Sequence, residues 1–144
     1  MNIVILGAGA MGSFFGGLLA KNSNQVTLVD VNKTHIDAIK ERGLILEVGG
    51  VPERIQVDAT TNAKEVSNAD LVILFCKYPD TESALSEAMA YIEPRTYIWT
   101  LQNGIGNIEK ISKFVEEDKI VKGLTSATAI IQGPGHVSTN FKGK

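Results

Sequence analysis

The chain opens with a short apolar run that turns directly into a G-x-G-x-x-G motif. The run covers residues 2–6, and the motif places glycines at Gly7, Gly9 and Gly12. An aspartate, Asp30, then ends the next apolar run. A strand, a glycine turn, a helix and an acidic residue in this order are typical of a dinucleotide-binding βαβ unit. The sequence therefore predicts nucleotide binding at the start of the chain.

A physical requirement explains the glycine at each of the three positions. Gly7 permits a tight turn, Gly9 lets the main chain approach a pyrophosphate, and Gly12 lets the following helix pack close to the strand. The N-terminus of that helix offers unpaired N–H groups and a positive dipole end to phosphates. Gly16 and Gly17 inside the helix weaken it, which indicates that the helix approaches the sheet closely.

Three other interpretations of the first 20 residues are open, because they carry no charged side chain. The segment could be a membrane span, a signal peptide or a glycine turn that binds no nucleotide. A signal peptide needs a basic region before its apolar core, whereas this chain begins Met1-Asn2. A membrane span rarely contains so many glycines so close together. These observations favour nucleotide binding.

Composition is that of an ordinary soluble domain. The 144 residues are enough for one domain with a core, and 44% of them are hydrophobic and 21% charged. A net charge of −2 gives no electrostatic case for nucleic acid or for an anionic membrane. The single cysteine, Cys76, excludes an intrachain disulfide and argues against a metal cluster. It lies in an apolar run, so we expect a buried structural thiol and a cytoplasmic protein.

Strand-like runs alternate with helical periodicity along most of the chain. We expect strands at 2–6, 25–29, 44–48, 54–57, 71–76 and 96–101. We expect helices at 11–19, around Ile36 and Ile39 up to Gly43, in a short capped turn at 62–65, from Asp80 or Thr81 to Pro94, and around 108–115. From Ile120 the pattern becomes a strand, a turn at 133–135 and a returning strand whose pattern continues to Lys144. The predicted fold is α/β over residues 1–144, a Rossmann-type doubly wound, mostly parallel sheet with a C-terminal strand pair.

Ligands on such sheets bind beyond the carboxyl ends of the strands, which is where Asp30 lies. Its carboxylate can accept both ribose hydroxyls of an adenosine, or it can cap the helix that begins at Asn32. If it faces the ribose, a 2′-phosphate there would meet a like charge. At about 4 Å and an effective dielectric near 20, that repulsion approaches ~4 kcal/mol. NAD is therefore favoured over NADP unless Lys33 compensates.

Lys77 and Asn103 also follow strands. Lys77 is either a solvated charge at a strand exit or a cation near the nicotinamide or a substrate carboxylate. Asn103 either belongs to an Asn-Gly turn or faces the ligand at a strand–loop–helix junction. His35, placed on the polar side of its predicted helix, and His136 are expected to be non-catalytic. No catalytic triad or metal-ligand cluster is evident in the sequence, so no metal is expected.

Four segments together resemble the ketopantoate reductase (2-dehydropantoate 2-reductase) family: Gly7-Ala8-Gly9-Ala10-Met11-Gly12, Cys76-Lys77, Gln102-Asn103-Gly104-Ile105-Gly106 and Gly133-Pro134-Gly135-His136-Val137. Members of this family reduce 2-dehydropantoate to pantoate with a nicotinamide cofactor, on the way to pantothenate and coenzyme A. The resemblance implies that residues 7–12 hold the pyrophosphate and that Lys77 and Asn103 line the cofactor–substrate cleft. It also implies that Ala129 contacts the cofactor through its backbone.

The sequence departs from the family pattern in two ways. The arginine that usually binds NADP would fall at Val31, so NAD-linked reduction of another branched 2-oxo acid is open. The family's helical C-terminal domain, which supplies the catalytic lysine and proton donor, is absent from this chain. The resemblance thus implies a cofactor-binding half with little or no turnover, whose partners are a 2-oxo acid, the missing domain and, as an open expectation, a second copy in a homodimer.

A non-catalytic NAD-sensing module is the alternative, like the regulatory Rossmann domains of potassium uptake systems. Such a module has a similar length and an acidic end to its second strand. The segment 102–106 and the closing strand pair favour the reductase, because a sensor has no evident need for them.

Overall fold

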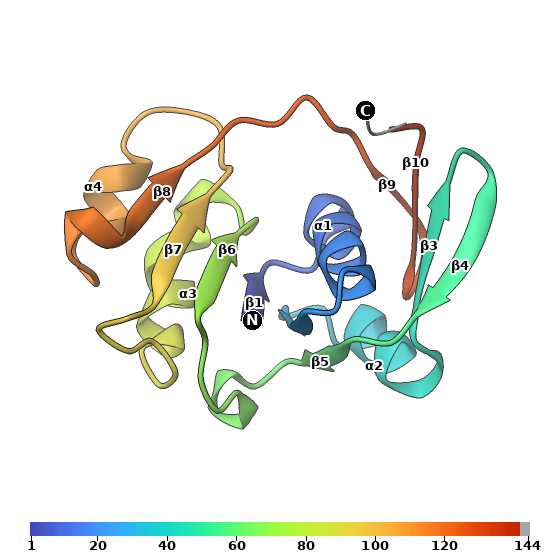
Figure 1. Ribbon diagram of the computed structural model, residues 1–144, viewed down its shortest axis with the longest axis horizontal. Helices are drawn as coiled ribbons and strands as arrows, with labels where there is room; N and C mark the ends of the chain where they lie inside the picture. The colour runs from blue at the N-terminus through green and yellow to red at the C-terminus, as the bar shows by residue number, and fades with distance from the viewer. Residues whose placement is uncertain (142–144) are drawn as a thin grey trace.

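The computed structural model describes residues 1–141 and contains two sheets (Figure 1). The larger is six-stranded, and every pairing in it is parallel. Its strand order is β5 (Asp58–Thr60), β2 (Gln25–Val29), β1 (Asn2–Leu6), β6 (Leu71–Leu74), β7 (Tyr97–Thr100) and β8 (Ile120–Lys122). The smaller sheet has the order β4 (Val51–Ile55), β3 (Leu44–Val48), β10 (His136–Thr139) and β9 (Ile130–Gly133).

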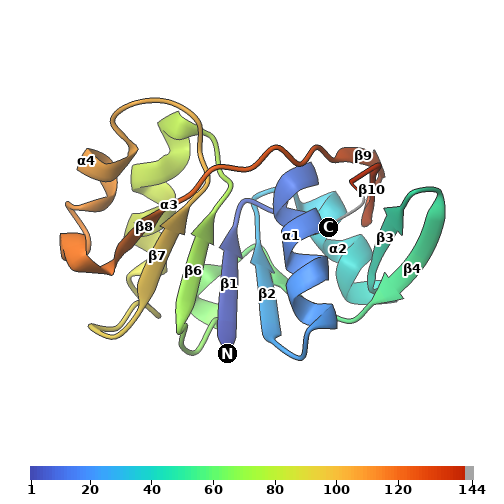
Figure 2. The same cartoon turned by 45° about the horizontal axis from the view of Figure 1, so that its top comes forward.

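Helices cover both faces of the larger sheet, which confirms the predicted doubly wound, mostly parallel architecture. The α-helices are α1 (Ala10–Lys21), α2 (Lys33–Arg42), α3 (Thr81–Ala88) and α4 (Asn107–Ile111). Residues 1–141 also form three short 3₁₀ helices: η1 (Ala63–Glu65), η2 (Tyr78–Asp80) and η3 (Glu117–Lys119). Figure 2 shows α1 in front of the sheet, with α3 and α4 on its other side.

The central strand β1 is buried on both faces, as its continuous apolar run predicts. Ile3 and Ile5 pack into the cluster that contains Phe14 of α1. Val4 and Leu6 point the other way and pack into the cluster that contains Leu85 of α3. Because side chains on both faces of β1 are packed in hydrophobic clusters, the position of the glycine turn that follows β1 is fixed.

Helix α1 lies between the two sheets, and its glycines make that position feasible (Figure 1). A Cβ on Gly16 would stand 2.6 Å from Cδ2 of Leu28 in the larger sheet. A Cβ on Gly17 would stand 3.1 Å from Cδ2 of both Leu44 and Leu46 in the smaller sheet. The close approach expected from this glycine pair is therefore confirmed on both sides of the helix.

The predicted C-terminal strand pair is confirmed as the antiparallel pair β9–β10. Its placement was not predictable from local pattern, because β10 pairs in parallel with β3, far away in the sequence. The hairpin β3–β4 was expected, although β4 begins at Val51 rather than residue 54. The segment from β8 to β9 crosses the molecule and links the two sheets (Figures 1 and 2).

Several expected boundaries were wrong. The expected helix up to Pro94 ends at Ala88, because the N–H groups of Ala90 and Tyr91 donate only three residues back, to the Glu87 and Ala88 carbonyls, and Tyr91 is buried. Helix α4 also stops early, at Ile111, where the chain tightens into turns. Strand β5 was missed because three edge residues give no periodic signal. Strand β10 ends at Thr139, and the expected continuation to Lys144 lies partly outside the described residues.

The helices of residues 1–141 are all too short or too polar to cross a membrane. The uncharged N-terminal segment instead forms β1, the glycine turn and α1.

Candidate functional site

Two of the three glycines in the turn after β1 have no room for a side chain. Gly7 has φ of +97°, its N–H donates to the Val29 carbonyl at 2.9 Å, and a Cβ on it would stand 2.5 Å from the main-chain N of Cys76. A Cβ on Gly12 would stand 1.8 Å from the Gly7 carbonyl oxygen. A Cβ on Gly9 would meet no atom of residues 1–141 within 4 Å. Gly9 thus faces open space, while Gly7 and Gly12 are packed against main chain.

The first turn of α1 presents main-chain donors beside this open space. Gly9 is the N-cap, and the Ser13 N–H donates to the Gly9 carbonyl at 2.9 Å. The N–H groups that precede Ser13 lie ahead of the helical hydrogen-bond ladder, and they include those of Ala10 and Met11. A helix N-terminus of this kind attracts an anion through its N–H groups and its dipole.

Asp30 fastens the glycine turn to the end of β2. Its Oδ2 accepts the Ala8 N–H at 2.7 Å, and its Oδ1 accepts the Asn32 N–H at 2.8 Å. The alternative role as a helix cap is not borne out, because Asn32 is the N-cap of α2 and its side chain accepts the His35 N–H. A carboxylate has about four acceptor positions, so Asp30 retains capacity for ligand hydroxyls.

A pocket of about 460 Å³ lies at the carboxyl ends of β1, β2 and β6. Four of the expected site residues line it: Gly7, Gly9, Asp30 and Lys77. The remaining lining comes from neighbouring strand ends, η1 and α3: Leu6, Val29, Val31, Thr61, Ala63, Phe75, Cys76, Asp80, Ser83, Ala84 and Glu87. Open Gly9, helix N–H donors, a carboxylate and an ammonium around one pocket fit a dinucleotide.

The other expected residues lie around this pocket rather than in its lining. Ala8 is buried behind the turn and donates to Asp30, and Ala10, Met11 and Gly12 form the first turn of α1. Asn103 is exposed in the loop after β7. Ala129 is partly buried just before β9 and packs against the core cluster around α1. Asn103 and Ala129 therefore stand outside this pocket.

Gln102 joins the loop after β6 to the loop after β7, a role that the sequence did not reveal. Its Nε2 donates to the Cys76 carbonyl at 2.7 Å and to the Thr81 Oγ1 at 2.9 Å. Its Oε1 accepts from the Thr100 hydroxyl at 3.1 Å. The candidate Lys77 directly follows Cys76, and the candidate Asn103 directly follows Gln102. Gln102 thus fixes the spacing between their two loops.

Asn107 organises the loop that carries Asn103. It is 2% exposed, and its Nδ2 lies within 3.2–3.4 Å of the carbonyl oxygens of Gln102, Asn103 and Gly104. One amide group therefore gathers three successive carbonyls of the loop. The sequence indicated only an asparagine directly after Gly106. Its hydrogen-bond partners depend on the geometry of the loop.

The expected place of His35 on a polar helix face was wrong. His35 is 3% exposed and is enclosed by α1 and the β9–β10 turn. Its Nδ1 accepts the Gly135 N–H at 3.0 Å, and its Nε2 lies 3.0 Å from the Ser13 hydroxyl. The Ser13 hydroxyl donates to the Ala8 carbonyl at 2.8 Å. Helical periodicity could not show this, because the partners lie in distant segments.

Cys76 is half-buried at the pocket rather than fully buried as expected. Burial raises the pKa of its thiol, while a hydrogen bond with Thr81 acts in the opposite direction. Within residues 1–141, no group of three or more potential ligands is placed to hold a metal ion.

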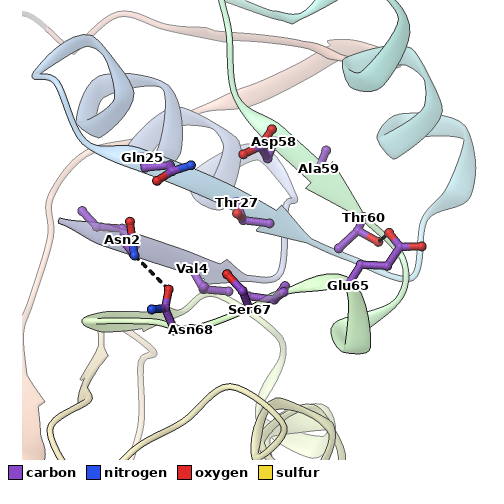
Figure 3. A pocket seen from close by; sticks show the side chains of 12 residues that line it. Asn2, Val4, Gln25, Thr27, Asp58, Ala59, Thr60, Glu65, Ser67 and Asn68 are labelled. Carbon is purple, nitrogen blue, oxygen red and sulfur yellow. Dashed lines mark hydrogen bonds between the residues drawn. The ribbon is translucent and has the colours of Figure 1, made fainter.

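A second pocket, of about 280 Å³, lies over one face of β1, β2 and β5 (Figure 3). Polar side chains line most of it, and Asn2 Nδ2 donates across its rim to Asn68 Oδ1 at 2.8 Å. The segment between β5 and β6 crosses here with only η1 as regular structure, so this part of the sheet face is thinly covered. The pocket does not include the glycine turn.

Comparisons with known proteins point to one family. The family described as "Ketopantoate reductase PanE/ApbA" matches residues 3–144. The 2-dehydropantoate 2-reductase of Lactococcus lactis is 39% identical over 137 residues, which are 94% of this chain and 44% of that protein. The enzyme of the same name from Pyrococcus horikoshii is 41% identical over 143 residues, 99% of this chain and 46% of that protein.

Solved structures show the same fold. A D-mandelate dehydrogenase in a ternary structure with NADH and anilino(oxo)acetate superposes with a TM-score of 0.91 at 37% identity, covering 96% of this chain and 45% of that one. A PanE/ApbA family ketopantoate reductase from Ralstonia eutropha superposes with a TM-score of 0.85 at 30% identity, covering 99% and 47%. The chain thus spans a little under half the length of these relatives, and it belongs to the ketopantoate reductase PanE/ApbA family.

Proposed function

We propose that this chain is the cofactor-binding half of an NAD(P)H-dependent reductase of 2-oxo acids. The observation that carries the proposal is the single pocket that Gly9, Asp30 and Lys77 share at the carboxyl ends of the strands. Family membership supports the reductase over the NAD-sensing module. A bound dihydronicotinamide would supply the hydride that reduces the ketone. 2-Dehydropantoate is the first substrate to test, because the curated relatives carry its name.

The chain's own residues have binding and orienting roles in this proposal. The N–H groups of the first turn of α1 hold the pyrophosphate, with Gly9 leaving room for it. Asp30 accepts ribose hydroxyls beside the turn that it already fastens. Lys77 and Asn103, kept at a fixed spacing by Gln102, orient the substrate carboxylate and carbonyl. Ala129 contacts the cofactor through its backbone.

We further propose that NAD is preferred over NADP. Asp30 lines the pocket, and a 2′-phosphate beside it would meet a like charge. Val31, at the position of the arginine expected of NADP-linked members, is 95% exposed and carries no charge to compensate. Lys33 is paired with Asp37 on α2, so its charge is partly balanced. The D-mandelate dehydrogenase structure that is similar to this chain contains NADH.

A second half of the protein is part of the proposal. The relatives are about twice as long as this chain. The proton donor and the rest of the substrate pocket would come from that half. The proposal therefore predicts cofactor binding by this chain and turnover only by the longer protein.

A calorimetric titration with NADH and, separately, NADPH tests the proposal. We expect NADH to bind at least about tenfold more tightly, which is ~1.4 kcal/mol. Asp30→Asn should narrow that ratio, because it removes the negative charge. Since both carboxylate oxygens accept main-chain N–H groups, the amide also loses one of these hydrogen bonds, so the affinity for both cofactors should fall while their ratio narrows. Asp118→Asn, the same change at an exposed position on η3 outside the pocket lining, is the control and should leave the ratio unchanged. Equal or preferential binding of NADPH would overturn the assignment of Asp30.

A further inference from the structure

Three hydrogen bonds connect the glycine turn with the β9–β10 hairpin through the interior. They run from the Gly135 N–H to His35 Nδ1, between His35 Nε2 and the Ser13 hydroxyl, and from that hydroxyl to the Ala8 carbonyl. Ser13 is fully buried and His35 nearly so. The other end of the Ala8 residue, its N–H, donates to Asp30. Both main-chain polar groups of Ala8 are therefore engaged.

The donors in this path specify one tautomer of His35. Nδ1 accepts a main-chain N–H, so the proton of the neutral ring lies on Nε2. Nε2 then donates to the Ser13 oxygen, and the Ser13 hydroxyl proton points to the Ala8 carbonyl. All hydrogen bonds run in one direction, from the hairpin to the glycine turn. A second proton, on Nδ1, would face the Gly135 N–H and break the path at its origin.

The hairpin end of the path is itself firmly held. The Gly135 carbonyl accepts the Ile45 N–H at 2.8 Å, and the Arg42 side chain donates to the Pro134 carbonyl. A Cβ on Gly135, whose φ is +71°, would stand 3.1 Å from the Ala38 Cβ. The turn is thus seated against α2 and β3, which makes it a fixed anchor for His35.

We propose that Ser13 and His35 are positioning residues for the cofactor. They hold the Ala8 carbonyl, and with it the adjoining N–H donors of the glycine turn, in the orientation that receives the pyrophosphate, and they do so only while His35 is neutral. This inference rests on the proposed function. Neither residue lines the pocket, so the effect of their side chains on binding passes through the turn.

The charges around His35 set the direction of the pH effect. Burial lowers the pKa of His35, and the carboxylate of Asp30 acts in the opposite direction. Helix α1 contributes the uncharged Ser13, and the hairpin contributes the Gly135 amide. On α2, Lys33 pairs with Asp37 at the surface.

Three further ionisable groups lie near the anchor. The Arg42 side chain donates to the Pro134 carbonyl, and His136 Nε2 lies 3.1 Å from a carboxylate oxygen of Glu47. With its pKa lowered, folded His35 is neutral at pH 8 and down through its ordinary value of about 6.5. At lower pH its protonation breaks the path, so cofactor affinity is expected to fall as the pH drops below the ordinary value of about 6.5.

The test is NADH affinity, measured by calorimetry from pH 8 to pH 5 on the longest form of the protein that the gene encodes. Ser13→Ala should weaken binding about tenfold at pH 8 while the unfolding midpoint shows a folded protein. His35→Gln keeps a neutral donor and acceptor, so it should bind within about threefold of wild type at pH 8 and lose the acid fall. His136→Gln changes the other histidine and should keep the wild-type profile.

A proton-linked role has a further signature that a merely structural residue lacks. If NADH binds the neutral state more tightly, saturating NADH must lower the pKa of His35, read from its ring resonances by NMR. Wild-type affinity in Ser13→Ala, a flat wild-type profile or a His35 pKa unmoved by NADH would overturn the inference. Failure of the wild type to bind either cofactor at pH 8 would overturn the proposed function instead.

Discussion

At the scale of single residues, substitutions at two glycines of the turn should have different effects, one on stability and the other on cofactor binding. Gly12→Ala places a Cβ 1.8 Å from the Gly7 carbonyl, so main chain must move. We expect it to lower the free energy of unfolding by about 2 kcal/mol or more, as strain at a packed site does. The Cβ of Gly9→Ala would meet no atom within 4 Å in the part of the chain that the structure describes, and Gly9 already has φ of −65°.

Gly9→Ala should therefore leave the free energy of unfolding within about 0.5 kcal/mol of wild type. Its methyl group enters the space assigned to the pyrophosphate, so NADH affinity should fall by at least about tenfold. Urea unfolding and calorimetry on both variants measure the two effects. Wild-type affinity in Gly9→Ala would show that the ligand does not approach this residue.

Cys76 gives a second prediction at this scale. Because burial raises the pKa of its thiol and only part of the residue is exposed, little reactive thiolate forms near neutral pH. We expect iodoacetamide to alkylate it more slowly than free cysteine at pH 8. It also lines the pocket, so saturating NADH should slow the reaction further. Mass spectrometry of the labelled protein follows both rates, and an NADH-independent rate would place the cofactor away from Cys76.

At the scale of elements, Gln102 tests how the loops after β6 and β7 are held together. Gln102→Glu removes the Nε2 donor and places a carboxylate beside the Cys76 carbonyl, which lies 2.7 Å from Nε2. A donor lost at a partly buried site typically costs about 1–3 kcal/mol. We expect a loss of that size in urea unfolding. Gln56→Glu makes the same change at an exposed position and should be nearly neutral.

The elements also show what the sequence could predict. Strands β1 and β2 and helices α1 and α2 carry local signals, namely apolar runs, 3.6-residue periodicity and terminal glycines, and their observed bounds are close to those expected. Strand β5 and the parallel pairing of β10 with β3 depend on partners distant in sequence. The site follows the same division. The glycine turn and Asp30 were predictable from a motif, whereas Gln102 and His35 act through partners that only the fold brings near.

At the scale of the whole molecule, residues 121–131 carry apolar side chains that remain exposed. Val121 is 45% exposed, Leu124 85%, Ile130 64% and Ile131 45%. These residues belong to or flank the segment that crosses from one sheet to the other (Figure 1). Surfaces of this kind on a folded domain mark contacts with other protein surfaces. The relatives, about twice as long, have a further half that could cover this segment.

From this exposed surface we expect one double variant to change self-association in the 144-residue chain and stability in a longer form of the protein. In the 144-residue chain, Leu124→Lys combined with Ile130→Lys should reduce concentration-dependent self-association, because two apolar contacts become charged. In a longer form of the protein whose second half covers this segment, as we propose, the same variant should lower the unfolding midpoint. Val51→Lys, at a residue 69% exposed on β4, is the control and should change neither property. Light scattering after gel filtration and thermal unfolding measure the two effects, and a full-length variant as stable as wild type would show that the second half packs elsewhere.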